Sequence, residues 1–278
     1  MKTLLAACAL TGLGLVAASL LSSASPAGAV RNQVQAGALV LVGGGGTPPE
    51  ALIEALALTG KEAPKVLVVP QASDLPDRGK SSVEMWREQG VEAKLLEPLD
   101  RQDAEEMLEE ADLIWLSGGS QRNLMRRLAE HQFASKIAFL HGHGTVIGGT
   151  SAGAAAMSTV MLSGDPDPRA LIAGAAAPYR GLAVWPSAIV DQHFIERDRY
   201  GRLLTAVLSK PRMVGVGIAE RTAVIVQGDD LRVLGEGQVV IFDARKAKTE
   251  RVPKGELQSA RGVQVHVIAA GETWAWFQ

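Results

Sequence analysis

The sequence predicts an α/β protein with a mostly parallel sheet, helices on both faces of that sheet, and an antiparallel β extension toward the C-terminus. Up to about residue 150, short runs of β-branched residues and leucine alternate with helix-length stretches. Such alternation is typical of parallel strands that are buried on both faces. After residue 213, the apolar runs are separated by turns that leave no room for helices. These late runs therefore indicate strands joined by hairpins.

The individual elements follow from the length and boundaries of each apolar run. The strands of the first half are expected at 38–46, 65–70, 91–96, 112–117 and 145–149, and the first of them runs into a glycine turn. The helices between them are expected at 48–58, 81–89 and 104–110, with two more within 121–140. The late strands are expected at 213–218, 222–227, 231–234, 238–242 and 263–270.

The N-terminus predicts a cleavable secretory signal over residues 1–29. Lys2 is followed by a long apolar run, and no acidic residue precedes Glu50. Ala27-Gly28-Ala29 forms a small-residue cleavage site, so we expect cleavage after Ala29 and an exported protein, periplasmic or extracellular. A membrane anchor is the alternative, because the apolar run approaches spanning length. Against an anchor, the run ends in small and polar residues without a basic cluster.

Composition narrows the chemistry of the exported chain. The protein has 28 basic and 30 acidic side chains and a formal net charge of −2, which gives no argument for a nucleic-acid partner or an anionic membrane surface. Its single cysteine, Cys8, lies in the predicted signal; the LAAC sequence that ends there resembles a lipoprotein box but lies too early in the apolar run. After cleavage the chain has neither a disulfide nor a cysteine nucleophile, and a serine nucleophile suits an oxidising compartment.

Three glycine-rich segments follow predicted strands, at 43–46, 117–121 and 149–151. Ligands of parallel α/β sheets collect at the carboxyl ends of the strands, so these segments are candidates for a site. The first segment could cradle a phosphate, but it lacks both the G-x-G-x-x-G spacing and the lysine of a P-loop. We interpret it as a tight turn beside a pocket.

Ser151 is the candidate nucleophile. Residues 149–153 read G-x-S-x-G, follow a predicted strand and precede helix-forming alanines, as in turns that present a reactive serine. The backbone N–H groups of Ala152 and Gly119 could then receive an oxyanion, helped by the positive end of the helix. In the alternative interpretation, Ser151 only caps a helix.

A serine nucleophile needs a base, and His193 is the best placed of five histidines. It follows a predicted strand and precedes an amphipathic helix. His131 lies on a polar helix surface, and His266 alternates within a strand. His141 and His143 could form a metal pair, but no third ligand is evident nearby, so neither a metal nor another cofactor is expected.

Charged side chains surround His193 in the segment VDQHFIERDRYGRL. Arg197, Arg199 and Arg202 could bind carboxylates through paired hydrogen bonds. They could equally belong to a solvated helix surface, where Asp198 and Arg202 form an i,i+4 pair. The residues alone leave both interpretations open.

Four segments resemble the cyanophycinase branch of a serine peptidase family that also includes aspartyl dipeptidase (dipeptidase E). They are GGTSAGA, SGGSQ, VDQHFIERDRYGRL and GVGIAERTAVIV, and the likeness covers most of residues 37–243. The resemblance implies a class I glutamine-amidotransferase-like, flavodoxin-like three-layer fold with serine in place of cysteine. Because the late strands indicate an extension and not a second domain, we expect a single catalytic domain over residues 30–278, and a homodimer stays open.

The resemblance implies roles for individual residues. Ser151 corresponds to the nucleophile, His193 to the base and Glu220 to the acid that orients the base, while Asp165 and Asp167 stay open as alternative acids. The implied substrate pocket consists of Gln121, Asp191, Gln192, Arg197, Arg199 and Arg202.

The implied substrate is a peptide or polymer. Cyanophycinases cleave multi-L-arginyl-poly-L-aspartate (cyanophycin) to β-Asp-Arg dipeptides, and other members act on aspartyl dipeptides. This sequence departs from the cyanophycinase pattern at Ala219, where an acidic residue is expected, and in PQASD at 70–74. A secreted aspartyl dipeptidase is therefore the alternative enzyme, and a binding protein that has lost the chemistry is the alternative from another class.

Overall fold

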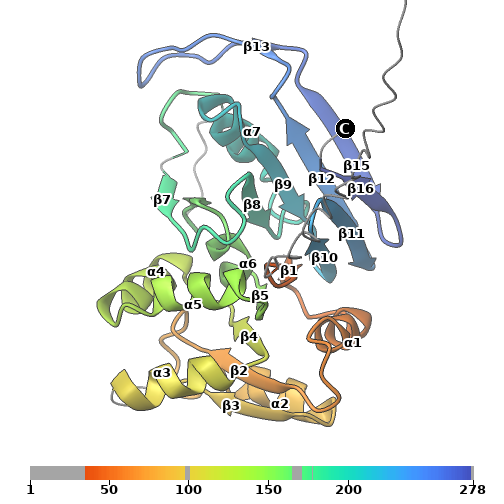
Figure 1. The fold of residues 1–278 in the computed structure, drawn as a ribbon. Coiled ribbons are helices and arrows are strands. Elements are labelled where there is room, and N and C mark those ends of the chain that lie inside the picture. Colours follow the sequence, from red (N-terminus) through yellow and green to blue (C-terminus); the bar gives the residue numbers. More distant parts are fainter. Residues whose placement is uncertain (1–34, 98–100, 165–170, 177, 277–278) are drawn as a thin grey trace, which may run out of the picture. The chain divides into compact units, whose positions relative to one another are not determined.

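An eight-stranded sheet forms the centre of the computed structural model, which describes residues 35–97, 101–164, 171–176 and 178–276 (Figure 1). Its strand order is β16-β11-β10-β1-β5-β4-β2-β3. The parallel part contains β1 (Leu39–Val42), β5 (Val146–Thr150), β4 (Leu113–Leu116), β2 (Lys65–Val69) and β3 (Glu92–Leu95). The antiparallel part contains β10 (Thr222–Gln227), β11 (Asp230–Gly235) and β16 (Thr273–Ala275).

Helices cover both faces of this sheet (Figure 1). One face carries α1 (Pro49–Ala57) and α2 (Lys80–Glu88). The other carries α3 (Arg101–Glu110), α4 (Gln121–Glu130), α5 (Phe133–Gly142) and α6 (Ala152–Ala156). Successive strand residues point to opposite faces of the sheet. Val40 therefore packs on the face that carries α1 and α2, and Leu41 packs on the face that carries α3 to α6. Burial on both faces explains why these strands are continuous apolar runs.

A second, four-stranded sheet has the order β15-β12-β9-β8. Its strands are β8 (Ala188–Gln192), β9 (Val214–Ile218), β12 (Gln238–Asp243) and β15 (Gln264–Ala269). Helix α7 (Tyr200–Ser209) connects β8 to β9 and packs on this sheet through Leu203 and Val207. Two short pairs complete the described strands: β6 (Val160–Leu162) with β7 (Pro178–Arg180), and β13 (Lys248–Thr249) with β14 (Ala260–Arg261).

The predicted fold class is confirmed: a largely parallel sheet carries helices on both faces and is followed by antiparallel strands. The structure adds that the late strands divide between two sheets. The strand expected at 213–218 pairs antiparallel with β12 but parallel with β8. This parallel pairing follows from α7, because parallel neighbours require a crossover connection of about a dozen residues or more, usually a helix.

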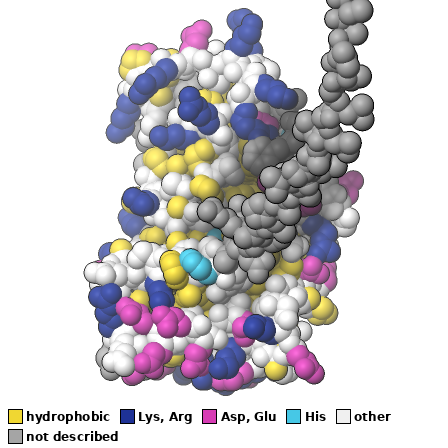
Figure 2. Space-filling view, in the orientation of Figure 1, with side chains coloured by type: hydrophobic (Ala, Val, Ile, Leu, Met, Phe, Trp, Pro, Cys, Tyr) yellow, Lys and Arg dark blue, Asp and Glu magenta, His cyan; other side chains and the backbone are white. Residues whose placement is uncertain are grey.

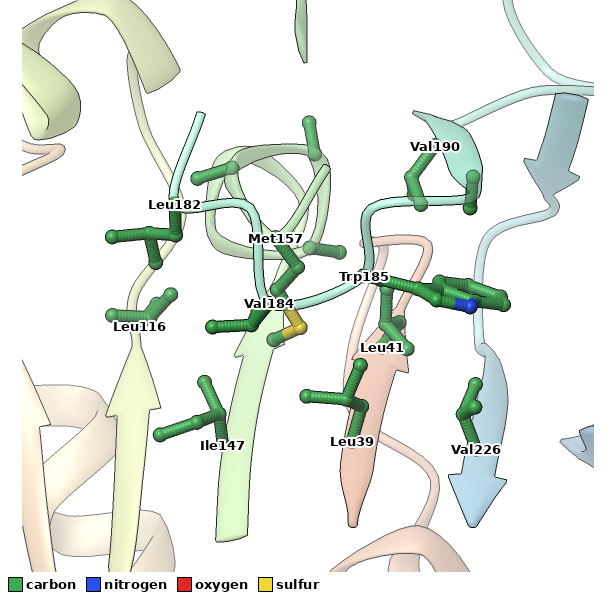
Figure 3. Close-up of a cluster of buried hydrophobic side chains, with 14 of the residues drawn as sticks. Leu39, Leu41, Leu116, Ile147, Met157, Leu182, Val184, Trp185, Val190 and Val226 are labelled. Atoms are coloured by element: carbon green, nitrogen blue, oxygen red, sulfur yellow. The ribbon is translucent and has the colours of Figure 1, made fainter. Parts of the chain in front are cut away.

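A buried cluster attaches the chain that leads into β8 to the parallel sheet (Figure 3). Leu39, Leu41, Leu116 and Ile147 project from the strands toward Met157, Leu182, Val184, Trp185 and Val190. Burying each large apolar side chain contributes about 1.5–3 kcal/mol. Helix α6 also packs against β8, so the carboxyl ends of β5 and β8 are held close to each other.

The predicted signal, residues 1–29, lies outside the described residues. Across the part of the chain that the structure does describe, none of the helices combines the length and apolar character that crossing a membrane requires. The described residues between 35 and 276 belong to one compact unit.

Candidate active site

Ser151 occupies a sharp turn between β5 and α6. Its backbone has φ 53° and ψ −110°, a positive φ that is uncommon outside glycine. A Cβ on Gly153 would lie 2.1 Å from the Leu116 carbonyl oxygen, and one on Gly149 would lie 2.9 Å from the Gly153 carbonyl carbon. Both glycines of the G-x-S-x-G pattern are thus required by close packing. Among the described residues, the Ser151 side chain makes no capping hydrogen bond to α6, which favours the nucleophile turn over the helix cap.

The Ser151 hydroxyl contacts an imidazole that in turn contacts a carboxylate. Ser151 Oγ lies 2.9 Å from His193 Nε2, and His193 Nδ1 lies 2.5 Å from Glu220 Oε1. The His193 side chain is 11% exposed and that of Glu220 is 26% exposed, so the pair is largely shielded from water. A hydroxyl, an imidazole and a carboxylate connected in this way can generate a nucleophilic serine oxygen.

Two parallel strands bring His193 and Glu220 together. His193 directly follows β8, and Glu220 follows β9 by two residues. Gln192 pairs with Ile218 at the ends of these strands, so both side chains emerge at the same edge of the second sheet. Asp165 and Asp167, the alternative acids, lie outside the described residues.

The end of β4 lies beside Ser151, where the oxyanion donors are predicted. A Cβ on Gly118 would lie 3.6 Å from Ser151 Cβ. Gly119 has φ 138°, and a Cβ there would lie 2.4 Å from the Ala72 carbonyl oxygen, so this turn also requires glycine. Ala152 follows Ser151 as the first residue of α6. The backbone N–H groups of Gly119 and Ala152 remain the predicted donors.

Asp191 forms a buried ion cluster with two of the predicted pocket arginines. Arg202 Nε donates to Asp191 Oδ2 at 2.7 Å, and Arg199 Nη1 lies 3.3 Å from Asp191 Oδ1. Arg199 Nη1 also donates to the Gln192 carbonyl oxygen at 2.6 Å. Burial lowers the pKa of Arg199 to about 10, against the attraction of Asp191, so the guanidinium stays charged at neutral pH. Of the two interpretations of these arginines, an exposed helix surface is therefore wrong for Arg199 and Arg202.

The other predicted pocket residues have different surroundings. Gln192 Oε1 accepts a long hydrogen bond of 3.4 Å from Ser151 Oγ. Gln121 is buried and donates to the Leu162 carbonyl oxygen at 3.1 Å, and Arg202 Nη1 donates to the Ser163 carbonyl oxygen at 3.2 Å. Gln121 and Arg202 thus both bind the backbone of the segment 162–163. Arg197 is exposed.

Replacing Asp191 with alanine should lower the free energy of unfolding by about 3–5 kcal/mol, because it leaves buried guanidinium charge without its partner. The side chains of Arg199 and Arg202 are only 6% and 9% exposed. Urea denaturation measures the change, and Asp77→Ala, which alters an exposed aspartate, should stay within about 0.5 kcal/mol of the parent. A loss below about 1 kcal/mol for Asp191→Ala would mean that water reaches the cluster.

Two supporting residues were not predicted from the sequence. Glu196 Oε2 accepts a hydrogen bond of 3.1 Å from the backbone N–H of Glu220. Ser158 is fully buried, and its Oγ accepts from the Val190 N–H at 2.9 Å. Glu196 lies three residues after His193, so its position in the sequence could have identified it as a site residue. The contact of Ser158 with Val190 depends on how β8 packs and could not be predicted from the sequence.

His141 and His143, the alternative metal pair, lie at the C-terminal end of α5. His141 is buried at the end of α5, and burial lowers its pKa. His143 is exposed, and its Nδ1 lies 2.7 Å from the Phe139 carbonyl oxygen. Within the described ranges, no three His, Cys, Asp or Glu side chains are grouped so that they could hold a metal ion.

An α/β fold that presents a serine on a strand-to-helix turn, facing an imidazole–carboxylate pair, defines a serine hydrolase. The family model described as peptidase family S51 matches residues 49–234. The chain therefore belongs to peptidase family S51, and it is a serine peptidase.

Individual relatives agree with this assignment. A cyanophycinase of Synechococcus elongatus is 33% identical over 219 residues, which cover 74% of this chain and 68% of that protein. A peptidase E of Actinobacillus pleuropneumoniae is 27% identical over 149 residues, which cover 50% of this chain and 61% of that protein. The crystal structure of a peptidase from an acI-B1 Actinobacterium aligns with a TM-score of 0.64 at 23% identity, over 87% of this chain and 98% of that one. This structural likeness shows a shared fold.

Proposed function

We propose that this protein is an exported cyanophycinase that hydrolyses multi-L-arginyl-poly-L-aspartate to β-Asp-Arg dipeptides. The observation that carries the proposal is the connected Ser151–His193–Glu220 contact, with distances of 2.9 and 2.5 Å. It occurs in a chain that is one-third identical to a cyanophycinase over 219 residues. Because arginine remains on the β-carboxyl of the product, the bond that breaks is the backbone amide between two aspartates.

In the acylation step, Ser151 Oγ attacks the carbonyl carbon of the scissile amide while His193 Nε2 takes the hydroxyl proton. Glu220 stabilises the imidazolium that forms and keeps the ring oriented. The negative oxygen of the tetrahedral intermediate accepts hydrogen bonds from the N–H groups of Ala152 and Gly119. When the C–N bond breaks, His193 donates its proton to the leaving amine, and an ester on Ser151 remains.

The deacylation step repeats this chemistry with water. His193 takes a proton from a water molecule, whose oxygen attacks the ester carbon. Collapse of the second tetrahedral intermediate returns the proton to Ser151 Oγ and releases a free α-carboxyl group. The cycle consumes one water for each backbone bond and leaves the three side chains unchanged.

For substrate recognition, we assign direct contact to Gln192, which lies beside Ser151, and to the exposed Arg197. We assign Asp191, Arg199, Arg202 and Gln121 to a fixed wall of the proposed substrate pocket. Support comes from their hydrogen bonds to one another and to backbone carbonyls. A wall whose polar groups are already ordered loses little conformational entropy when a ligand binds.

The charge of the enzyme suits such a polymer. Each Asp-Arg unit carries one guanidinium and one free carboxylate, so the polymer has no net charge. The protein is close to neutral as well. On the visible face, Lys and Arg side chains gather near α7 and β13, and Asp and Glu side chains gather near α3 (Figure 2). Neither sign of charge dominates this face, which is compatible with a substrate that has no net charge.

The substrate assay uses the purified protein with insoluble cyanophycin and, separately, with α-Asp-X dipeptides. We expect release of soluble β-Asp-Arg, identified by mass spectrometry, and slower or absent cleavage of the dipeptides. Ser151→Ala protein is the matched control for contaminating peptidases. Cleavage of the dipeptides alone would establish the second candidate, an aspartyl dipeptidase, which the likeness to a peptidase E favours. Binding of cyanophycin without any product would establish a catalytically silent protein.

The proposal includes export, because cyanophycin is too large to be imported and its dipeptides are not. We expect the mature protein to begin at Val30 and to be found outside the cytoplasm. N-terminal sequencing of protein from the native host, after cell fractionation, measures both properties. An intact Met1 terminus in the membrane fraction would instead support the anchor.

A further inference from the structure

We propose that the glycine loop, Gly43–Gly45, is a positioning element that holds His193 and Glu220 in their reactive arrangement. From the sequence alone, these glycines predict only a tight turn beside a pocket. The inference rests on the proposed catalytic roles of the two side chains and extends them to a third, distant segment of the chain. The loop follows β1, whereas His193 and Glu220 follow β8 and β9.

The backbone of the glycine loop is hydrogen-bonded to both catalytic segments. The His193 N–H donates to the Gly43 carbonyl oxygen at 2.8 Å, and the Arg221 N–H donates to the Gly44 carbonyl oxygen at 2.8 Å. The Gly43 N–H donates to the Thr222 carbonyl oxygen at 2.9 Å. One loop therefore fixes the backbone of the base itself and the two residues that follow the acid.

The same loop lies directly against both catalytic side chains. A Cβ on Gly44 would lie 2.3 Å from His193 Cε1 and 2.5 Å from Nε2, the atom that faces Ser151. A Cβ on Gly45 would lie 2.6 Å from Glu220 Oε2. Any side chain at either position must push the imidazole or the carboxylate away. The absence of side chains thus lets the loop form the wall against which the pair is aligned.

Backbone strain at the catalytic segments explains why such a wall is needed. His193 has φ 47° and Arg221 has φ 49°, a region that non-glycine residues occupy only when their surroundings hold them there. Both residues donate their N–H groups to the glycine loop. The loop therefore stabilises the strained turns from which the two catalytic side chains emerge.

The test compares Gly44→Ala with Gly46→Ala. Both glycines have positive φ, 98° and 118°, so alanine strains the backbone at either position. A Cβ on Gly46 would meet only Arg221 Cγ, at 3.8 Å, so the control lacks the contact with the imidazole. We expect Gly44→Ala to lower kcat about 100-fold with KM changed less than about threefold, since a displacement near 1 Å costs about this much. Gly46→Ala should stay within about fivefold of the parent.

A second measurement does not depend on any substrate. Thermal unfolding of Gly44→Ala, His193→Ala and the double variant forms a double-mutant cycle. Because His193→Ala removes the ring that the new Cβ would meet, Gly44→Ala should cause a smaller loss of Tm in the His193→Ala protein than in the parent. We expect the two losses to differ by at least about 3 °C, roughly 1 kcal/mol of coupling for a domain of this size. The cycle of Gly46→Ala with His193→Ala should be additive. Gly45→Ala with Glu220→Ala gives an independent second cycle if Gly44→Ala does not fold.

These results separate failure of the inference from failure of the proposed function. Non-additivity in the Gly44 cycle, or in the Gly45 cycle where Gly44→Ala does not fold, supports positioning even if the protein cleaves no aspartyl peptide. If the losses of Tm are additive in the Gly44 cycle, or in the Gly45 cycle where Gly44→Ala does not fold, the inference is overturned whatever the activity. Equal losses of kcat in Gly44→Ala and Gly46→Ala overturn it too, because backbone strain alone would then explain both.

Discussion

Replacing Ser151 with alanine should lower kcat about a million-fold, since removing the nucleophile of a serine triad has an effect of this size. The reason is chemical: alanine has no oxygen that His193 can deprotonate, and the 2.9 Å contact with Nε2 disappears. The folded state should survive, because the strained turn is held by Gly149, Gly153 and the 2.9 Å hydrogen bond from the Ser151 N–H to the Val42 carbonyl oxygen. Initial rates of β-Asp-Arg release, with circular dichroism to verify folding, measure the effect.

Ser158→Ala is the matched control for this prediction. It removes a hydroxyl from the same stretch of sequence, but this hydroxyl accepts a hydrogen bond from the Val190 N–H and lies apart from the imidazole contact. The buried N–H left behind should reduce stability by about 1–3 kcal/mol and leave kcat within a few-fold of the parent. A fluorophosphonate probe should label the parent and Ser158→Ala, but not Ser151→Ala. Full activity of Ser151→Ala protein would contradict the proposed mechanism.

Glu220→Gln should lower kcat by about 10³–10⁴-fold while KM changes only a few-fold. The amide fills the same space but carries no charge to stabilise the imidazolium, and it permits the wrong tautomer of His193; the corresponding change in another serine protease reduces kcat by about 10⁴. The 2.5 Å contact between Glu220 Oε1 and His193 Nδ1 motivates the prediction. Steady-state kinetics over a range of pH measures it.

The control for this prediction is Glu236→Gln. Glu236 is an exposed carboxylate that pairs with Arg221 at 2.7 Å, so its replacement tests whether any nearby negative charge matters. It should leave kcat within about twofold, because exposed ion pairs contribute little. If Asp165→Asn or Asp167→Asn abolishes activity and Glu220→Gln does not, the acid is assigned to the wrong residue.

Most of the regular elements and the nucleophile turn could be predicted from the sequence. The expected strand at 145–149 and the helix-forming alanines after Ser151 correspond to β5 and α6. The expected strands at 65–70 and 112–117 likewise correspond to β2 and β4. These predictions succeed because strand and helix periodicity, and the need for glycine in a crowded turn, depend on residues that are close together in the chain.

The partners of the pocket residues could not be predicted in the same way. Arg199 and Arg202 were equally compatible with substrate binding and with a solvated helix surface. In the structure, both contact Asp191, which is 1% exposed. Whether a charged side chain faces water or a buried partner depends on what packs against its helix, and that information is not in the local pattern.

Local sequence patterns are enough to predict the succession of strands and helices along the chain, the serine turn, and a histidine after a strand in a segment that resembles a peptidase family. The folded structure is needed to see that β8 and β9 pair in parallel, that Glu220 therefore reaches His193, and that the glycine loop after β1 lies against both. The difference lies in the range of the interactions. Turn and helix preferences act over a few residues, whereas strand pairing and packing join segments that are 27 residues apart for Glu220 and His193, so these contacts exist only once both sheets are assembled.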